Sequence, residues 1–156
     1  MHKPVAVIPC YNHPATIGLM VDAVHAHGLV SVVVDDGSNA ETARTLDALA
    51  TQHGTHMQLV RLAQNQGKGG AMMAGLRAAY AAGYSHALQI DADGQHDVAD
   101  IPKFLAHSLA HPDTVICGEP CYDASVPKGR LYGRYATHIW VWINTLSLDI
   151  RDSMCG

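Results

Sequence analysis

The stretch LVSVVVDDGS at residues 29–38 decides the fold class of this chain. Its first part, residues 29–34, is apolar and rich in β-branched valine, which favours a buried strand. Its second part, residues 35–38, is polar and typical of a turn. A buried strand that ends in two adjacent carboxylates predicts a sheet whose polar turns carry the chemistry.

Short apolar runs and longer helical stretches alternate along the rest of the chain. The predicted strands are residues 4–8, 29–34, 57–62, 86–90 and 114–117. The predicted helices are residues 13–27, 40–52, 69–82 and 97–110, the last with Asp97 as its N-cap. The repeated strand–helix order predicts an α/β fold, a mostly parallel sheet with helices on both faces.

Composition limits the function classes. The chain has 156 residues, of which 48% are hydrophobic and 15% charged, with a formal net charge of -4. One domain with a real core is therefore expected, and a general nucleic-acid binder, which would be basic, is disfavoured. The sequence has no apolar run long enough to span a bilayer and no secretory signal at its N-terminus, so we expect a cytoplasmic location. Four scattered cysteines do not have the spacing of a zinc site.

Polar residues follow each of the first four predicted strands. The turns are residues 10–12, 35–38, 65–69 and 91–96. In a parallel sheet the carboxyl ends of the strands share one edge, where ligands bind. We therefore expect the four turns to meet in one cleft.

The turn after the fourth strand indicates a metal site. Asp91, Asp93 and Gln95 alternate along the chain and offer hard oxygen ligands, which suit Mg²⁺ or Mn²⁺ completed by water and phosphate oxygens. The alternative is a solvated acidic turn. The position directly after a buried strand favours the metal.

The turn after the second strand has two adjacent carboxylates. Asp35 and Asp36 at this position can accept hydrogen bonds from a base or from ribose hydroxyls, so both are candidate substrate ligands. The alternative is an ordinary Asp-Gly turn. Two carboxylates exceed what such a turn requires, so we favour binding.

The other two turns carry weaker signals. Lys68 and the glycines around it, in residues 66–70, fit a phosphate site or a flexible helix start, but not a P-loop. Tyr11 and Asn12 offer an aromatic face and an amide to a nucleoside, or simply lead into a helix.

The last segment differs in charge from the rest. Residues 1–126 hold six basic and twelve acidic residues, whereas residues 127–156 hold four basic and two acidic ones. We therefore expect a boundary after residue 126, between a core of residues 1–126 and a distinct segment of residues 127–156. The aromatic run at 139–143 predicts a helix, either at a membrane surface or in a core.

Taken together, the motifs resemble those of one family. They are VIPCYN at 7–12, VVDDGS at 33–38, NQGKGGA at 65–71 and DADGQH at 91–96. In this order they resemble the family 2 nucleotide-sugar glycosyltransferases with the GT-A fold. The DADGQH form and the closing RDSMCG at 151–156 resemble the branch of polyprenyl-phosphate (dolichol-phosphate) mannose or glucose synthases.

The resemblance implies roles on the donor side. Pro9, Tyr11 and Asp36 would line the nucleoside pocket, and Lys68 would approach the nucleotide. The pair Asp91 and Asp93 would hold the metal and the diphosphate, with Gln95 as a further ligand and Asp93 in a catalytic role.

The resemblance implies that residues 1–126 form the nucleotide-sugar-binding core and that residues 127–156 begin an acceptor-side segment of a partial chain. It also implies roles on the acceptor side. Arg134 would face the diphosphate or the acceptor phosphate, and Arg130 is a second basic candidate. Asp152 would lie near the acceptor and is the first candidate for a general base, with Asp123 second. The branch commonly places an arginine soon after the fifth strand, where residues 118–122 read GEPCY. The acceptor class therefore stays open.

The implied reaction transfers a hexose, with inversion, from a nucleotide-diphosphate donor of the GDP-mannose or UDP-glucose type. The expected cofactor is Mg²⁺ or Mn²⁺, and the expected acceptor is lipid-linked, a polyprenyl phosphate, reached by peripheral contact at the inner face of the membrane. The alternatives are a nucleotidyltransferase and a non-catalytic nucleotide-binding module. A nucleotidyltransferase would usually carry a glycine-rich, basic first turn, which residues 9–12 are not.

Overall fold

A computed structural model describes residues 2–118, 137 and 139–143. The chain divides into two compact units, residues 1–114 and residues 115–156. The predicted functional boundary after residue 126 falls inside the second unit and stays a prediction. All the strands and named helices below belong to the first unit.

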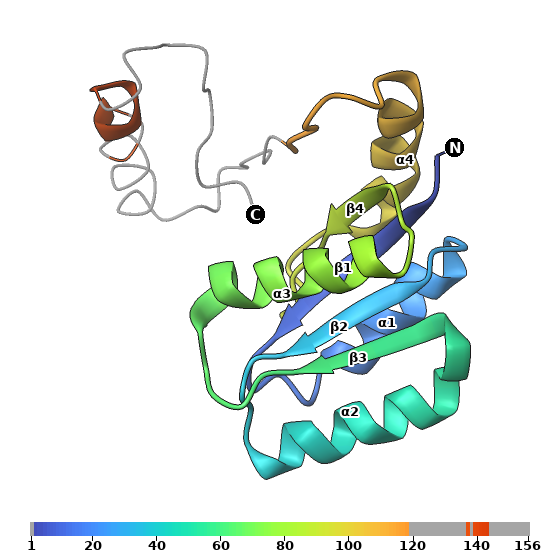
Figure 1. The fold of residues 1–156 in the computed structure, drawn as a ribbon, viewed down its shortest axis with the longest axis vertical. Coiled ribbons are helices and arrows are strands. Elements are labelled where there is room, and N and C mark those ends of the chain that lie inside the picture. Colours follow the sequence, from blue (N-terminus) through green and yellow to red (C-terminus); the bar gives the residue numbers. More distant parts are fainter. Residues whose placement is uncertain (1, 119–136, 138, 144–156) are drawn as a thin grey trace. The chain divides into compact units, whose positions relative to one another are not determined.

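The first unit contains a four-stranded parallel sheet with strand order β3-β2-β1-β4 (Figure 1). The strands are β1 (Pro4–Cys10), β2 (Ser31–Asp35), β3 (Met57–Arg61) and β4 (His86–Gln89). The helices are α1 (Ile17–Ala26), α2 (Ala40–His53), α3 (Gly67–Ala81) and α4 (Ile101–Ala110). The two strands that follow β1 in the chain, β2 and β3, lie on one side of it, and β4 lies on the other side, so the strand order reverses between β1 and β4. Open α/β sheets bind ligands at such a reversal, beyond the carboxyl ends of the strands.

Side-chain alternation along the strands gives the sheet two buried faces. On one face Ala6 and Ile8 of β1 and Val33 of β2 pack with residues of α1, α2 and α4. On the other face Val5 and Val7 of β1 pack with Val32 and Val34 of β2 and with Ala71 and Ala79 of α3. Figure 1 shows α3 in front of the sheet and α1 behind it. The predicted α/β architecture, with helices on both faces, is confirmed.

The predicted fifth strand at residues 114–117 is wrong. The backbone N–H of Thr114 donates to the carbonyl of His111 and closes a turn, and Val115 is 87% exposed. β-Branched residues favour a strand only where a partner strand and a buried face reward them. The predicted helix at 13–27 begins later, at Ile17: the α conformation is disfavoured at His13, which precedes Pro14, and residues 14–16 form a turn before the helix.

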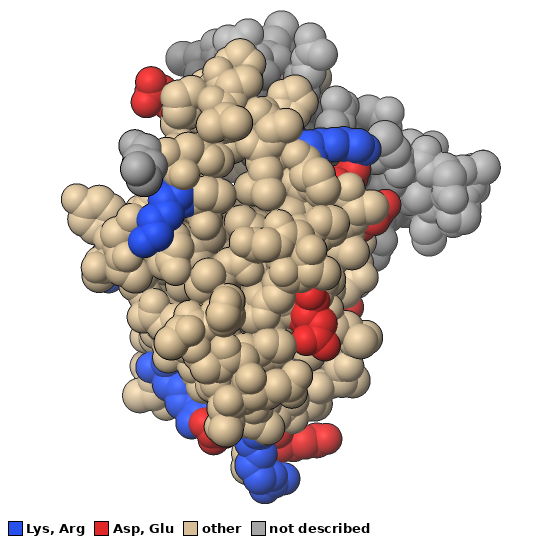
Figure 2. Space-filling view, turned by 90° about the vertical axis from the view of Figure 1, so that its right-hand side faces the viewer, with Lys and Arg blue, Asp and Glu red and all other residues tan. Residues whose placement is uncertain are grey.

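The surface is mainly uncharged on the face that Figure 2 shows, where acidic and basic side chains are scattered among a larger neutral area. In the second unit, residues 137 and 139–143 are helical, as predicted for the aromatic run. Ile139, Trp140 and Ile143 are exposed there. Within the described residues, no helix combines the length and hydropathy needed to cross a bilayer.

A histidine cluster lies at the amino end of the sheet, away from the polar turns. The Nδ1 atoms of His25, in α1, and His53, in α2, are 3.1 Å apart. The Nε2 atom of His25 is 3.1 Å from the Ser31 hydroxyl, and that of His53 is 3.4 Å from Asp22. The ring of His56 lies 6.3 Å from that of His25. Burial lowers the pKa of His25, and repulsion from His53 lowers it further, against the smaller opposing effects of a hydrogen bond with the His56 backbone and of Asp22.

The free energy of unfolding should therefore fall as the pH falls through about 6.5, the ordinary pKa of histidine. The unfolded chain takes up a proton there, whereas folded His25 resists it, so protonation favours unfolding. Urea unfolding between about pH 7.5 and about pH 5.5 measures this, and His25→Gln should flatten the dependence. His107→Gln, at an exposed histidine of α4, is the control. An equal slope in wild type and His25→Gln would contradict the prediction.

Candidate functional site

A cleft of about 350 Å³ opens at the carboxyl edge of the sheet. Its walls come from all four predicted turns, as the sequence led us to expect. The lining residues are Pro9, Cys10, Tyr11, His13, Asp36, Asn65, Gly67, Lys68, Ala71, Asp91, Ala92 and Asp93. The cleft thus lies beyond β1 and β4, where the strand order reverses.

Asp91 is the most unusual group of the cleft. Its Oδ2 atom accepts a hydrogen bond from the Lys68 ammonium at 2.8 Å and lies 3.7 Å from Nε2 of His96. Its Oδ1 atom is buried and has no hydrogen-bond partner among the described residues. An unsatisfied buried oxygen costs about 1–3 kcal/mol, and more when it is charged. The site therefore keeps an acceptor available for a donor or cation that the described part of the chain does not supply.

The donor set fits a hard divalent cation. Asp91 and Asp93 both line the cleft, and carboxylate oxygens are the ligands that Mg²⁺ and Mn²⁺ prefer. Within the described residues, no group of three or more His, Cys, Asp or Glu side chains is arranged to hold a metal alone. Such ions commonly use one or two protein carboxylates and complete their shell with substrate phosphates and water.

Gln95 does not join these carboxylates in the cleft lining. Gly94 has a φ of +77°, which breaks the alternation that would have kept Gln95 on the side of Asp91 and Asp93. The backbone N–H of Gln95 instead donates to Oδ1 of Asp93 at 3.0 Å. The turn thus restrains Asp93, and the metal-ligand role of Gln95 stays a prediction.

Asp36 is held in the cleft wall by the end of β1 and by the residue that precedes α3. Its backbone N–H donates to the carbonyl of Cys10, and its Oδ1 accepts from the backbone N–H of Gln66 at 2.7 Å. Asp36 is buried yet lines the cleft. No hydrogen bond within the described residues uses its Oδ2 atom, so one oxygen remains for a ligand.

The remaining cleft residues supply one cation and one aromatic ring. Lys68 lies in the first turn of α3, and its side chain is 50% exposed. The ring of Tyr11 is 46% exposed. Burial, aided by the charge of Asp35, raises the pKa of the Cys10 thiol to about 11. Cys10 therefore stays neutral and non-nucleophilic at physiological pH.

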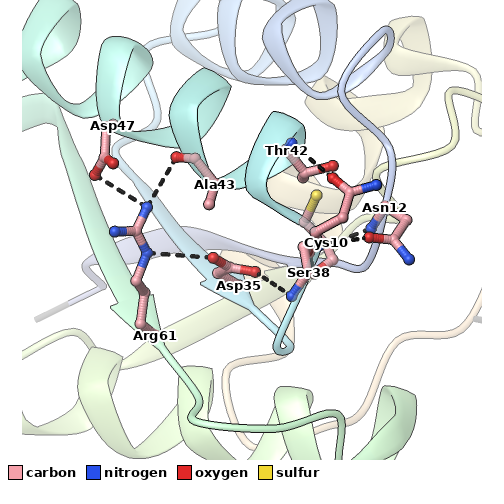
Figure 3. Close-up of polar contacts among 9 residues, drawn as sticks. Cys10, Asn12, Asp35, Ser38, Thr42, Ala43, Asp47 and Arg61 are labelled. Carbon is pink, nitrogen blue, oxygen red and sulfur yellow. Dashed lines mark hydrogen bonds and ion pairs between the residues drawn. The ribbon is translucent and has the colours of Figure 1, made fainter.

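Asp35, a predicted substrate ligand, is not among the residues that line the cleft. Its buried carboxylate accepts from the backbone N–H of Ser38 at 2.9 Å and from Nε of Arg61 at 3.2 Å (Figure 3). Arg61 also donates to the carbonyl of Ala43 and pairs with Asp47 at 3.0 Å. The bonds of Asp35 tie the end of β2 to β3 and, through Arg61, to α2.

Replacing Arg61 with leucine should reduce the free energy of unfolding by about 2–3 kcal/mol, because it leaves a buried carboxylate without its cation. Urea unfolding near neutral pH measures this loss. Asp47→Asn is the matched control: it removes only the 60% exposed partner of Arg61 and should cost about 1 kcal/mol or less. Equal losses in the two variants would contradict an internal role for the Asp35–Arg61 pair.

Asn12 also has an internal role. Its Oδ1 accepts from the backbone N–H of Asn39 at 2.8 Å, and its own N–H donates to the Ser38 hydroxyl. It has a φ of +58°, a left-handed conformation that Asn tolerates better than most residues. Asn12 thus joins the first and second turns, and it is not among the cleft-lining residues.

Six predicted site residues meet in the cleft: Pro9, Tyr11, Asp36, Lys68, Asp91 and Asp93. The acceptor-side predictions, at Arg130, Arg134, Asp152 and Asp123, lie outside the described residues. Sequence reasoning did not select His13 and Asn65, which also line the cleft. His13 directly follows the motif at residues 7–12, and Asn65 is the first residue of the motif at 65–71. Their position beside these motifs could have indicated that they line the cleft.

Curated relatives match this chain over most of its length. Undecaprenyl-phosphate mannosyltransferase of Micrococcus luteus is 34% identical over 83% of this chain and 51% of its own. Polyprenol monophosphomannose synthase of Mycolicibacterium smegmatis is 32% identical over 73% of this chain and 44% of its own. Dolichyl-phosphate beta-glucosyltransferase of Dictyostelium discoideum is 29% identical over 96% of this chain and 51% of its own. The chain spans about half the length of these relatives.

Comparisons with solved structures and with the sequence model of a protein family also match glycosyltransferases. Mannosyltransferase PcManGT from Pyrobaculum calidifontis, solved in complex with GDP-Man and Mn²⁺, superposes with a TM-score of 0.52 at 26% identity, over 58% of this chain and 27% of its own. S. aureus TarS gives a TM-score of 0.59 at 20% identity, over 80% of this chain and 38% of its own, which supports the GT-A fold alone. The model described as Glycosyl transferase family 2 matches residues 5–148. The chain therefore belongs to glycosyl transferase family 2, and to the polyprenyl-phosphate and dolichyl-phosphate branch that its motifs resemble.

Proposed function

We propose that this protein binds a nucleotide-diphosphate sugar in the cleft and transfers its hexose, with inversion, to a lipid-linked phosphate. The observation that carries the proposal is the convergence of Asp36, Lys68, Asp91 and Asp93 on one cleft at the reversal of strand order. GDP-mannose and UDP-glucose are the donor types to test. The chain matches only about half the length of its relatives. The activity of the whole protein is therefore proposed here together with the site.

The nucleoside would lie toward the β1 and β2 turns. The unused oxygen of Asp36 would accept from a base N–H or a ribose hydroxyl. The exposed ring of Tyr11 would pack on the base or ribose, beside Pro9. The neutral Cys10 thiol adds no charge to this part of the cleft.

The diphosphate would lie between the β4 turn and the first turn of α3. Asp91 and Asp93 would hold Mg²⁺ or Mn²⁺, which when bound neutralises the diphosphate and stabilises it as a leaving group. Lys68 would donate to phosphate oxygens from the amino end of α3, which itself favours an anion. Preorganised charge of this kind stabilises a departing diphosphate in the transition state.

The acceptor would supply an already ionised nucleophile. A phosphate monoester is largely ionised near neutral pH, so it needs no general base. Arg130 and Arg134 are the basic residues proposed to face its charge, whereas a hydroxyl acceptor would require a base such as Asp152. Exposure of Ile139, Trp140 and Ile143 on a helical segment supports contact with lipid, at the inner face of the membrane.

A transfer assay tests this proposal directly. The protein is incubated with Mn²⁺, polyprenyl phosphate in detergent, and GDP-mannose or UDP-glucose labelled in the sugar. We expect label in the lipid fraction with one donor, and loss of nearly all of it in Asp93→Ala. Nucleotide binding without transfer or donor hydrolysis would contradict the proposal and leave a binding module.

A further inference from the structure

The two oxygens of Asp91 are in opposite situations. Oδ2 accepts a hydrogen bond from the Lys68 ammonium at 2.8 Å, whereas Oδ1 is buried and has no hydrogen-bond partner in residues 2–118, 137 and 139–143. A lysine ammonium carries three donors, yet within the described part of the chain Lys68 has only this carboxylate as its partner. Lys68 therefore balances the charge of Asp91 but leaves the Oδ1 atom of that carboxylate available as a ligand.

The position of Lys68 is unfavourable for a cation. It is the second residue of α3, whose first turn holds no acidic residue. The positive end of the helix dipole opposes a positive side chain there. In the free protein the ion pair with Asp91 offsets this repulsion, and a bound anion would offset it as well.

Lys68 is also free to change partner. Its side chain is half exposed, and lysine has a flexible four-carbon stem. The cleft lining carries three carboxylates, of Asp36, Asp91 and Asp93, against this one ammonium. Any divalent cation that reaches Asp91 therefore competes with the charge of Lys68, and the displaced ammonium remains at the helix end where an anion is favoured.

We propose that Lys68 is the resident counter-ion of Asp91, which releases the carboxylate to the divalent cation and turns to the donor diphosphate. Lys68 then opposes binding of the cation alone and favours binding of the nucleotide with the cation. The cation and the nucleotide are thereby coupled, each raising the affinity for the other. Only the second part of this inference, the contact of Lys68 with the donor diphosphate, rests on the proposed function.

Two titrations of wild type and Lys68→Met test the inference. In the first, Mn²⁺ alone is titrated, with free Mn²⁺ followed by electron paramagnetic resonance. We expect Lys68→Met to bind Mn²⁺ about fivefold more tightly or better, the lower end of typical coupling between sites. In the second, GDP and UDP are titrated by calorimetry at saturating Mn²⁺, and we expect Lys68→Met to bind the preferred nucleotide about tenfold more weakly. Lys103→Met, which removes an exposed ion pair between Lys103 of α4 and Asp100 just before that helix, should change neither titration.

The outcomes separate this inference from the proposed function. Unchanged or weaker Mn²⁺ binding by Lys68→Met would overturn the counter-ion role, whatever the nucleotides do. Tighter Mn²⁺ binding with unchanged nucleotide binding would overturn the transfer of Lys68 to the diphosphate. If wild type binds neither nucleotide, the proposed function fails, and the Mn²⁺ titration still decides the counter-ion role.

Discussion

Replacing Asp91 with asparagine should weaken binding of the preferred nucleotide, GDP or UDP, in the presence of Mn²⁺ by about 100-fold, or about 2.7 kcal/mol. Asparagine keeps the shape of the side chain and removes the charge that would hold the cation. Calorimetric titration measures the loss. The control is Asp113→Asn, at an exposed carboxylate outside the cleft lining, which should leave the affinity unchanged.

Asp91→Asn should not reduce the free energy of unfolding. Wild-type Asp91 keeps a buried, unsatisfied charged oxygen, so neutralising it removes a desolvation cost and gives up one partly exposed ion pair with Lys68. We expect the free energy of unfolding to stay equal or rise while binding falls, as is common for residues kept for function. A large loss of stability with intact binding would show that Asp91 is a structural carboxylate.

Replacing Gly37 with alanine should reduce the free energy of unfolding by about 3–4 kcal/mol and abolish measurable nucleotide binding. Gly37 has a φ of +68°, and an added Cβ would lie 2.6 Å from the backbone N of Asn65. The backbone of the β2 turn and that of the loop before α3 would have to separate. Their separation would break the bond from Gln66 to Asp36, which orients that carboxylate.

Gly28 offers a matched control for Gly37. It has a similar φ of +75°, and an added Cβ would meet nothing within 4 Å. Gly28→Ala should therefore cost only the strain of the left-handed backbone, about 1–2 kcal/mol, and leave nucleotide binding unchanged. Urea unfolding and calorimetry of both variants measure the difference. Similar losses in the two variants would contradict the close packing of the two turns.

The sequence was sufficient to predict the sheet and the edge where the cleft lies. Strands of buried β-branched residues followed by polar turns have few alternative arrangements, and parallel pairing brings those turns to one edge. The strand predicted at residues 114–117 was wrong because the β-propensity of a segment carries no information about whether a partner strand lies beside it. Thr114 is used in a turn, and Val115 has no buried face to join.

The site was less predictable, because the sequence does not show which way each carboxylate points. Asp35 and Asp36 are adjacent, and strand alternation separates them. Asp35 shares the register of Arg61 on β3 and pairs with it, whereas Asp36 lies in the cleft wall. Strand register would be needed to separate these roles in advance. Gln95 illustrates the same limit, since a single left-handed glycine before it ended the alternation.

Paramagnetic broadening tests the central claim most directly, namely that a divalent cation and a nucleotide diphosphate bind together at the carboxyl edge of the sheet. Small amounts of Mn²⁺ are added with GDP or UDP to the isotope-labelled protein, and amide signals are followed by NMR. We predict selective loss of the signals of Asp36, Lys68 and residues 91–95, stronger with the preferred nucleotide than with Mn²⁺ alone. Broadening centred on His25 and His53 at the opposite end of the sheet, and unaffected by nucleotide, would contradict the account.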